Sequence, residues 1–264
     1  MTPVVLTVAG SDSSAGAGMQ ADVKTACALG CYPLTAVTCV VCEAPGCVEG
    51  IVPMEADFVA AQVRLCLRRF PVAAAKCGML YSPGIVRAVA EALRGTNIPL
   101  VVDPVMLATA GKPLMLREAL SAYREQLFPL ASVVTPNLDE LCCLLGCPAP
   151  STPDELAEAA AGLSAQLGCA VLAKGGHLPG HDCTDILVDR HGAELLRRTH
   201  PRTTGISTHG TGCTLSAALA SGLASGLSLT DATERALLYT AAAIAHSHRF
   251  PAVCALNHTP PGQD

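Results

Sequence analysis

The chain has 264 residues and a formal net charge of −5, and 50% of its residues are hydrophobic while 15% are charged. This length suits one large α/β domain or two small ones, and the negative net charge argues against a nucleic-acid partner, which needs a basic face. The chain has no run of 18 apolar residues and no basic segment before its short N-terminal apolar stretch. We therefore expect no membrane partner, no signal peptide and a cytoplasmic protein.

Short β-branched or apolar runs alternate with Ala- and Leu-rich runs of helical periodicity. In chain order the patterns predict strand 4–8, helix 19–29, strand 33–41, helix 57–70, strand 74–77, helix 84–93, strand 100–103, helix 114–127, strand 132–135, helix 138–145, helix 153–167 capped by Ser151 or Thr152, strand 170–173, a hairpin of 185–189 with 194–199, and helices 213–222 and 232–248.

This alternation predicts an α/β fold, with a mostly parallel central sheet covered by helices on both faces. No linker or internal repeat interrupts the pattern, so residues 1–250 are interpreted as a single domain. Residues 251–264 contain Pro251, Pro260 and Pro261 and are predicted to form an irregular C-terminal tail.

Fourteen cysteines raise the possibility of disulfides or a metal site. Most of them lie in apolar runs, where they are interpreted as small core residues. Cys39 and Cys42 have C-x-x-C spacing, but no second pair or His partner follows at the spacing of a zinc site. A metal or redox role for this pair is therefore disfavoured.

The stretch from Thr208 to Ala218 places two glycines around Thr211, then Cys213 and a run of small residues. Gly210 and Gly212 leave backbone N–H groups free to turn toward one point, and the helix that follows adds its own N-terminal N–H groups. Such a turn can hold a phosphate, and a thiol in the first helical turn is expected to have a lowered pKa. The alternative is a glycine-rich cap beside a buried cysteine.

Other polar residues follow predicted strands, where ligands bind in open parallel sheets. They are the glycine loop 10–18, Asp103, Asn137, Glu140 and Lys174. Each could instead be a turn, a helix cap or a solvated strand end, but their shared position favours a site. Gly16 and Gly18 partly match a dinucleotide-binding fingerprint, which leaves an NAD(P)-dependent oxidoreductase as an alternative, although the expected acid is poorly placed. The chain lacks a P-loop motif.

The chain resembles the hydroxymethylpyrimidine/phosphomethylpyrimidine kinases of thiamine biosynthesis, which belong to the ribokinase-like superfamily. The resemblance rests on six segments in family order, residues 9–25, 76–80, 102–106, 135–140, 174–178 and 208–217, and Asn257-His258 is similar to the family's closing motif. It implies a three-layer α/β/α fold, ATP and Mg²⁺ as cosubstrates, a homodimer, and two phosphorylations, first of the hydroxymethyl group and then of the monophosphate.

The resemblance also implies residue roles. Cys213 would be the catalytic base beside an anion hole of Gly210, Thr211 and Gly212. Asp103, Lys174 and Thr208 would lie at the ATP and Mg²⁺ site, where Asn137 and Glu140 would hold Mg²⁺ through water. The pyrimidine pocket would be lined by Gly10, Asp22, Glu43, Met79 and Val105.

Two positions depart from the family pattern. Glu43 stands where the family has a glutamine that hydrogen-bonds the pyrimidine, and an ionised carboxylate can accept from the ring but cannot donate to it. Thr109 replaces a family lysine that follows Val105-Met106, with Lys112 nearby. Alternatives that remain are a kinase of pyridoxal, pyridoxine or another hydroxymethyl heteroaromatic in the same fold, and a ligand-binding sensor without turnover.

Overall fold

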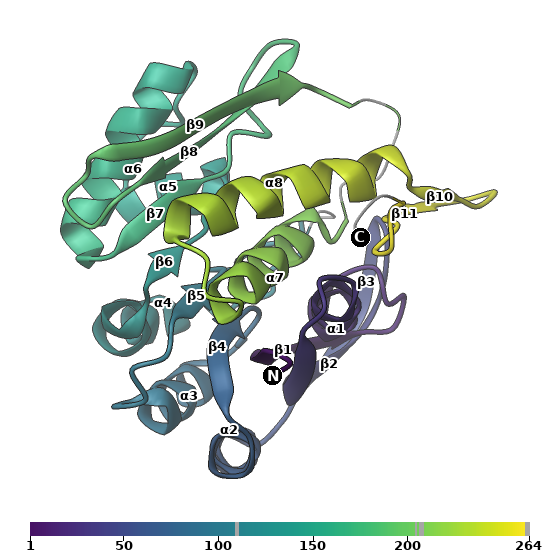
Figure 1. Ribbon diagram of the computed structural model, residues 1–264, viewed down its shortest axis with the longest axis vertical. Helices are drawn as coiled ribbons and strands as arrows, with labels where there is room; N and C mark the ends of the chain where they lie inside the picture. Colours follow the sequence, from purple (N-terminus) through teal and green to yellow (C-terminus); the bar gives the residue numbers. More distant parts are fainter. Residues whose placement is uncertain (109–110, 204, 206–208, 262–264) are drawn as a thin grey trace.

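The computed structural model describes residues 1–108, 111–203, 205 and 209–261. Its main feature is a nine-stranded sheet in the order β3-β2-β1-β4-β5-β6-β7-β8-β9 (Figure 1). The strands are β1 (Val4–Asp12), β2 (Tyr32–Ala44), β3 (Cys47–Pro53), β4 (Val72–Cys77), β5 (Leu100–Val102), β6 (Val133–Val134), β7 (Ala170–Ala173), β8 (Asp182–Val188) and β9 (Glu194–Pro201).

The centre of this sheet is parallel and its edges are antiparallel. Strands β2, β1, β4, β5, β6 and β7 pair in parallel, whereas β3 pairs antiparallel with β2, and β8 and β9 form an antiparallel hairpin beside β7. The carboxyl ends of the six parallel strands therefore meet at one edge, as the sequence pattern predicts.

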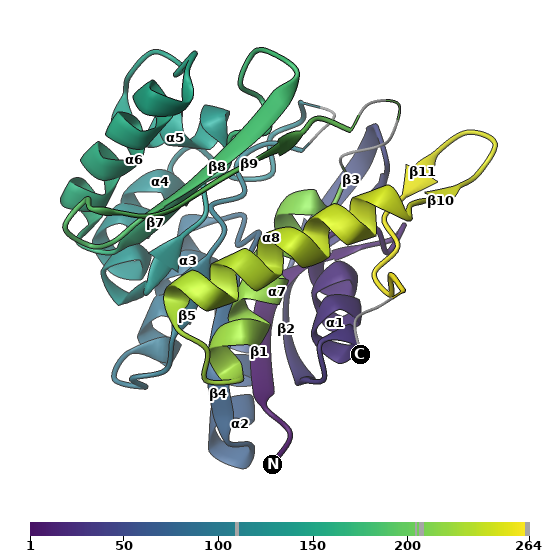
Figure 2. The same ribbon diagram turned by 45° about the horizontal axis from the view of Figure 1, so that its top comes forward.

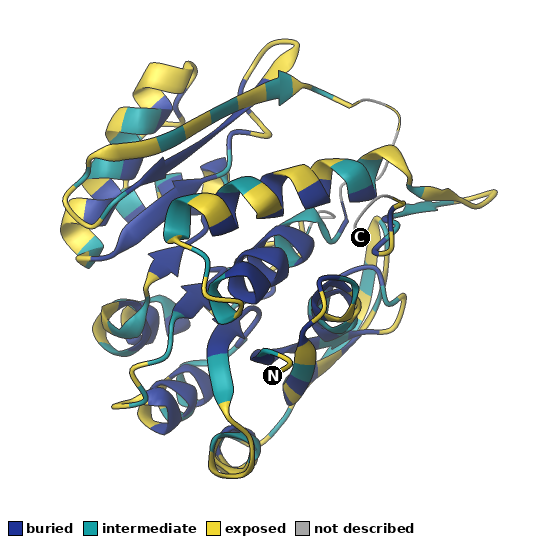
Figure 3. Ribbon diagram, viewed as in Figure 1, coloured by how far each residue is buried: buried dark blue, intermediate teal, exposed yellow. Residues whose placement is uncertain are grey.

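Helices cover both faces, which gives the predicted three layers (Figures 1 and 2). One face packs against α2 (Ala56–Arg69), α3 (Pro83–Leu93), α4 (Ala119–Ala122), α5 (Leu138–Leu145) and α6 (Pro153–Leu167), and the other against α1 (Gly18–Ala28), α7 (Thr211–Ala224) and α8 (Leu229–Ala245). Along β1, Leu6 belongs to the first core and Val5 to the second, because successive side chains point to opposite faces. Figure 3 shows that the central strands and α7 are mostly buried.

Local signals explain where several helices begin. Thr152, one of the two predicted caps, accepts a hydrogen bond from the backbone of Glu155 at the start of α6. Asn137 and Glu140 form a reciprocal capping box on α5, and Gly146 ends that helix in the left-handed region. None of the helices that the structure describes is long and apolar enough to cross a membrane.

Three local predictions differ from the structure. Strand β3 was not predicted, because Gly50 and Pro53 weaken its pattern and its position at the sheet edge leaves it half exposed. The predicted helix 114–127 begins only at Ala119 and continues as a π-helical turn, Tyr123–Leu127. Leu114 instead donates its backbone N–H to the Met106 carbonyl. The tail is not wholly irregular, since β10 (His248–Arg249) pairs with β11 (Cys254–Ala255).

Candidate active site

A cavity of about 610 Å³ opens at the carboxyl ends of the parallel strands. Most of the residues predicted for the site line it: Gly10, Glu43, Met79, Asp103, Val105, Asn137, Glu140, Lys174, Gly210, Thr211, Gly212 and Cys213. Asp22 is not among the lining residues and lies 2% exposed beneath the cavity wall. Thr208 falls outside the described residues.

The turn before α7 is built around Gly210, whose φ of 85° lies in the left-handed region. A Cβ at this position would lie 1.9 Å from the Gly16 carbonyl oxygen, so the turn packs directly on the first glycine loop. A Cβ at Gly212 would lie 3.3 Å from Lys174 Nζ and 3.4 Å from Asp103 Oδ2. Backbone N–H groups at a helix start, next to an ammonium, suit an anionic group such as a phosphate.

Cys213 lies in the first turn of α7 and is half-buried. The N–H of Gly18, at the start of α1, also acts on this thiol, so the N-termini of two helices act on it together. Burial nevertheless raises the pKa of Cys213 to about 12; Lys76 and the Gly18 N–H act to lower it, and Asp22 and Asp103 act to raise it. The lowered pKa expected from the sequence is therefore wrong, since desolvation outweighs the helix termini.

An ion pair joins the ends of β5 and β7. Lys174 Nζ lies 2.8 Å from Asp103 Oδ1, which also accepts a hydrogen bond from Thr135, and 3.9 Å from Glu140 Oε2. Burial acts to lower the pKa of Lys174, but Asp103 and Glu140 outweigh it and raise the pKa. Lys174 therefore keeps its positive charge at the cavity wall, close to Gly212.

Asn137 and Glu140 use their side chains in the capping box of α5. The backbone N–H of Asn137 donates to Glu140 Oε2 at 2.8 Å, and that of Glu140 donates to Asn137 Oδ1 at 2.9 Å. Burial raises the pKa of Glu140 to about 7, with Lys174 opposing the shift. Within the described part of the chain, no three His, Cys, Asp or Glu side chains are grouped so that they could hold a metal ion. Amide and carboxylate oxygens, the donor types present in Asn137 and Glu140, are those that Mg²⁺ takes in proteins, usually together with several waters.

The first glycine loop is fastened to the α7 turn by Asp12 and His209. Asp12 Oδ2 lies 2.9 Å from His209 Nε2 and accepts the backbone N–H of Ala17 at 2.7 Å. Burial acts to raise the pKa of Asp12, but the bonds from His209, Ser14 and Ala17 outweigh it and lower the pKa. Neither residue of this pair was predicted for the site, although Asp12 ends β1 and His209 adjoins the predicted anion hole.

Glu43 is half-buried on the opposite wall, at the end of β2. Its backbone is held by Ser13, whose hydroxyl donates to the Glu43 carbonyl at 2.9 Å and accepts from its N–H at 2.9 Å. Burial raises the pKa of the carboxyl to about 7, and the charge of Asp12 adds to this shift while His209 opposes it. The carboxyl can therefore donate a proton near neutral pH, which an ordinary glutamate cannot do.

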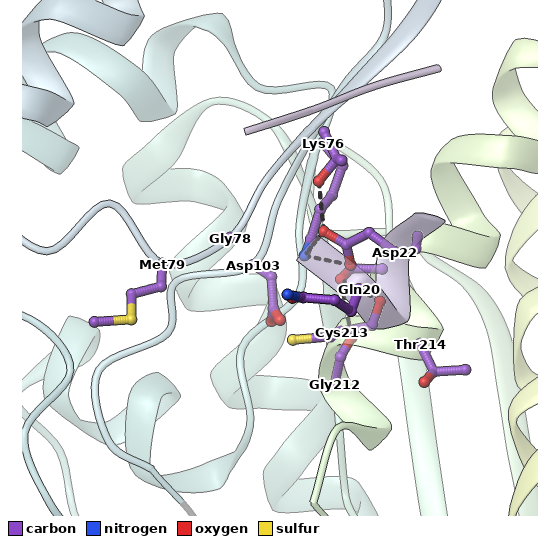
Figure 4. A network of polar contacts seen from close by, with 12 residues as sticks. Gln20, Asp22, Lys76, Gly78, Met79, Asp103, Gly212, Cys213 and Thr214 are labelled. Atoms are coloured by element: carbon purple, nitrogen blue, oxygen red, sulfur yellow. Dashed lines mark hydrogen bonds and ion pairs between the residues drawn. The ribbon is translucent and has the colours of Figure 1, made fainter. Parts of the chain in front are cut away.

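A second ion pair joins Lys76 on β4, which lines the cavity, to Asp22 on α1 behind it (Figure 4). Lys76 Nζ donates to both carboxylate oxygens at 2.8 Å, and Thr7 donates to Oδ2. The pair explains why Asp22 does not line the cavity, whereas Lys76 does. Lys76 lies in a matching motif, but nothing local in the sequence indicated a charged residue buried within a strand.

The family model described as phosphomethylpyrimidine kinase matches residues 12–255. The chain is 41% identical over 250 residues to a hydroxymethylpyrimidine/phosphomethylpyrimidine kinase of Rhizobium meliloti, covering 95% of this chain and 93% of the relative. It is 42% identical over 244 residues to the protein of that name from Escherichia coli, covering 92% and 91% of the two chains.

Solved structures share the fold over nearly the whole chain. An ADP complex of Bacillus subtilis pyridoxal kinase superposes with a TM-score of 0.89 at 34% identity, covering 98% of each chain. A phosphomethylpyrimidine kinase from Clostridium difficile superposes with a TM-score of 0.78 at 34% identity, covering 91% of this chain and 98% of the other. Pyridoxal kinase from Staphylococcus aureus, in complex with AMP-PCP and pyridoxal, has a TM-score of 0.87 at 31% identity, covering 99% and 95%.

Proposed function

The chain belongs to the phosphomethylpyrimidine kinase family, and on that premise we propose that it phosphorylates 4-amino-5-hydroxymethyl-2-methylpyrimidine and then its monophosphate. ATP is the phosphoryl donor, as the nucleotide complexes of the related structures suggest. The observation that best supports the proposal is the meeting of Cys213, the Gly210–Gly212 turn and Lys174 in one cavity. A thiol, an anion-binding turn and a cation are the groups that an alcohol kinase without a P-loop needs.

Cys213 is the proposed base. In the transfer, the hydroxymethyl oxygen forms a bond to the γ-phosphorus of ATP, the bond from that phosphorus to the ADP oxygen breaks, and the hydroxyl proton passes to the Cys213 thiolate. Because the pKa of this thiol is about 12, its thiolate is a strong base but a rare species at neutral pH. Nearby positive charge must therefore favour the thiolate before the transfer.

The other polar residues are proposed to orient the phosphates. The N–H groups of Gly210, Thr211 and Gly212 would point to the transferred group, and Lys174 would neutralise phosphate charge. Thr208, which lies outside the described residues, keeps its proposed place near ATP. Asn137 and Glu140 would hold Mg²⁺ through water, with Asp103 beside them. When bound, Mg²⁺ would supply neutralisation of the negative charge on the phosphates.

The ring is proposed to bind against an apolar wall. Met79 packs with the buried Cys39 and Val41, and Val105 adjoins this cluster. A Cβ at Gly10 would lie 2.8 Å from Cys39 Sγ and 3.3 Å from Met79 Sδ, so glycine lets this wall close tightly. The neutral Glu43 carboxyl would donate to a ring nitrogen and accept from the adjacent amino group. A protonated Glu43 would thus replace the glutamine of the family.

A pyridoxal or pyridoxine kinase is the second candidate, favoured by Glu43 and by the similarity to pyridoxal kinases of known structure. Both candidates can be tested by mass spectrometry of reactions that contain purified protein, ATP, Mg²⁺ and one substrate. Appearance of the pyrimidine monophosphate and then the diphosphate would support the main proposal. Phosphorylation of pyridoxal or pyridoxine without turnover of the pyrimidine would support the second. Light scattering of the same sample would test the expected homodimer.

A further inference from the structure

We propose that Lys76 is a positioning residue for this site: its buried ammonium, held by Asp22, favours the thiolate form of Cys213 and so enables the sulfur to accept the substrate's proton. This inference rests on the role proposed above for Cys213. The ion pair between Lys76 and Asp22 would then have a function besides linking β4 to α1 (Figure 4).

The first argument is burial. The side chains of Lys76 and Asp22 are 1% and 2% exposed, so both charges are withdrawn from water. Removing two charges from water costs several kcal/mol per ion before their mutual attraction is counted, and hydrophobic replacements are often at least as stable. Stability alone is therefore a poor explanation for a pair at this place.

The second argument is geometry. Lys76 contributes to the lining of the cavity, whereas Asp22 lies behind it. Two of the three N–H donors of an ammonium are directed to the Asp22 oxygens, each at 2.8 Å. A Cβ at Gly78 would lie 2.8 Å from Lys76 Nζ, so the absence of a side chain there makes room for the ammonium. Asp22 on one side and the backbone of Gly78 on the other therefore fix the position of the ammonium.

The third argument is the balance of charge around the sulfur. The groups that face Cys213 are Lys76 from β4, Asp22 and the Gly18 N–H from α1, and Asp103 after β5, with Lys174 paired to Asp103. Lys76 has the largest electrostatic effect among them in favour of the thiolate, and this effect is larger than that of Asp22 or of Asp103 taken singly. The influence is mutual, since Asp22, Cys213 and Asp103 raise the pKa of Lys76 against the effect of burial.

The test measures the alkylation rate of Cys213 by iodoacetamide between pH 7 and 10, read peptide by peptide by mass spectrometry. The exposed Cys47 of the same chain serves as the internal reference. The variants are Lys76→Met and the neutral pair Lys76→Met/Asp22→Asn, which remains available if the single variant fails to fold. Alkylation requires the thiolate, so we expect a rate about tenfold lower at each pH in Lys76→Met. The decrease should be smaller in the double variant, where the opposing charge of Asp22 is removed as well, and Cys47 should be unchanged in both.

A purely structural link would give another result. Loss of the link would loosen the site and leave the alkylation of Cys213 unchanged or make it faster, and either outcome would overturn the proposal. If the wild type fails to phosphorylate the pyrimidine while the alkylation rate still falls in the variants, the proposed function fails but the coupling of Lys76 to Cys213 stands.

Gly78→Ala displaces the ammonium without removing its charge. With the wild type shown to be active, we expect this variant to lower kcat several-fold and leave the KM for ATP unchanged. Gly162→Ala on α6 is the matched control, because a Cβ there meets only Leu145 at 3.9 Å. Equal kcat values for the wild type and the Gly78→Ala variant would contradict the proposed placement.

Discussion

At the scale of single residues, the proposed chemistry depends most on the thiol of Cys213. Its removal should slow phosphoryl transfer and leave the nucleotide site intact, because the sulfur acts on the alcohol. We expect Cys213→Ala and Cys213→Ser to lower kcat by about 10²- to 10⁴-fold, the usual contribution of a general base. Steady-state kinetics gives kcat, and titration with a non-hydrolysable ATP analogue should give a Kd within about twofold of the wild type.

Cys47→Ala is the control for the loss of a thiol, since Cys47 is exposed on β3 and does not line the cavity. An unchanged kcat in Cys213→Ala would remove Cys213 as the base. A large loss of ATP affinity in the same variant would show instead that the substitution disturbs the phosphate turn.

Glu43 offers a second test, through pH. Its pKa of about 7 lies above the ordinary value of 4.5, so the carboxyl is mostly neutral at pH 6 and mostly ionised at pH 8. If the neutral acid pairs with the aminopyrimidine, the KM for this substrate should rise about tenfold between pH 6 and pH 8, as the binding form is lost. In Glu43→Gln this rise should be absent, and the KM should change only as the ring itself titrates.

The pyrimidine ring of the substrate also titrates. The change in KM that this causes is the part of the pH dependence that the wild type shares with Glu43→Gln. A KM that falls with rising pH in the wild type alone would mean that the carboxylate is the binding form. That result would favour a ring that presents two N–H donors.

At the scale of elements, the start of α7 depends on a glycine that no other residue can replace. Gly210→Ala would introduce a methyl group 1.9 Å from the Gly16 carbonyl oxygen, in addition to strain at a φ of 85°. Gly226→Ala is the matched control, with a φ of 84° and no described atom within 4 Å of the added carbon. The control should lose about 1–3 kcal/mol in the free energy of unfolding from strain alone.

We expect Gly210→Ala to lose more than the control, together with nearly all activity, because the turn must move away from the first glycine loop. Denaturant unfolding and the kinase assay measure the two effects. Equal losses of stability in the two variants, with activity retained in Gly210→Ala, would contradict the packing of these loops.

Hydrophobic periodicity was sufficient to predict the bounds of elements whose burial pattern is regular. The predicted helix 153–167 has the same bounds as α6, and the predicted strand 170–173 has the bounds of β7. It was insufficient where contacts distant in the sequence decide the local structure. Residues 114–118 have helical spacing, but Leu107 and Pro113 form a β-bridge and Leu114 bonds back to Met106, so the helix is delayed.

In the site, too, regular positions could be predicted from the sequence, whereas contacts between distant residues could not. Asp103 and Lys174 could be predicted because each follows a strand, and a parallel sheet brings such positions to one edge. Lys76 could not be assigned, since it lies inside β4 and its partner Asp22 is 54 residues earlier in the chain. A buried ammonium is stable in the core only when it is paired, and the partner of Lys76 is distant in the sequence.

At the scale of the whole molecule, the C-terminal tail returns to the active-site helix. His258 is 3% exposed, and its Nε2 lies 3.1 Å from the Thr214 hydroxyl on α7. Tyr239 on α8 donates to the His258 carbonyl at 2.5 Å. The Thr214 hydroxyl in turn donates to the carbonyl of Gly210. The segment that the sequence analysis treated as a tail thus contacts the helix that begins at the anion-binding turn.

This contact makes the stability of the molecule depend on pH. Burial lowers the pKa of His258 to about 4, with Lys24 and His248 acting in the same direction. In the unfolded chain the imidazole takes up a proton near pH 6.5, whereas in the folded chain it resists protonation until about pH 4. The contribution of His258 to stability is therefore complete above pH 6.5 and is lost as the pH falls toward 4. Between pH 7.5 and 4.5 this loss amounts to about 2.5 kcal/mol.

We expect His258→Gln to remove this part of the pH dependence. Between pH 7.5 and 4.5 the Tm of the wild type should fall about 5 °C further than that of the variant, whatever the stability of the variant at neutral pH. His191→Gln, at an exposed turn between β8 and β9, is the control and should follow the wild type. Parallel Tm curves for the wild type and His258→Gln would contradict the prediction, since they would mean that His258 takes up a proton in the folded chain as readily as in the unfolded chain.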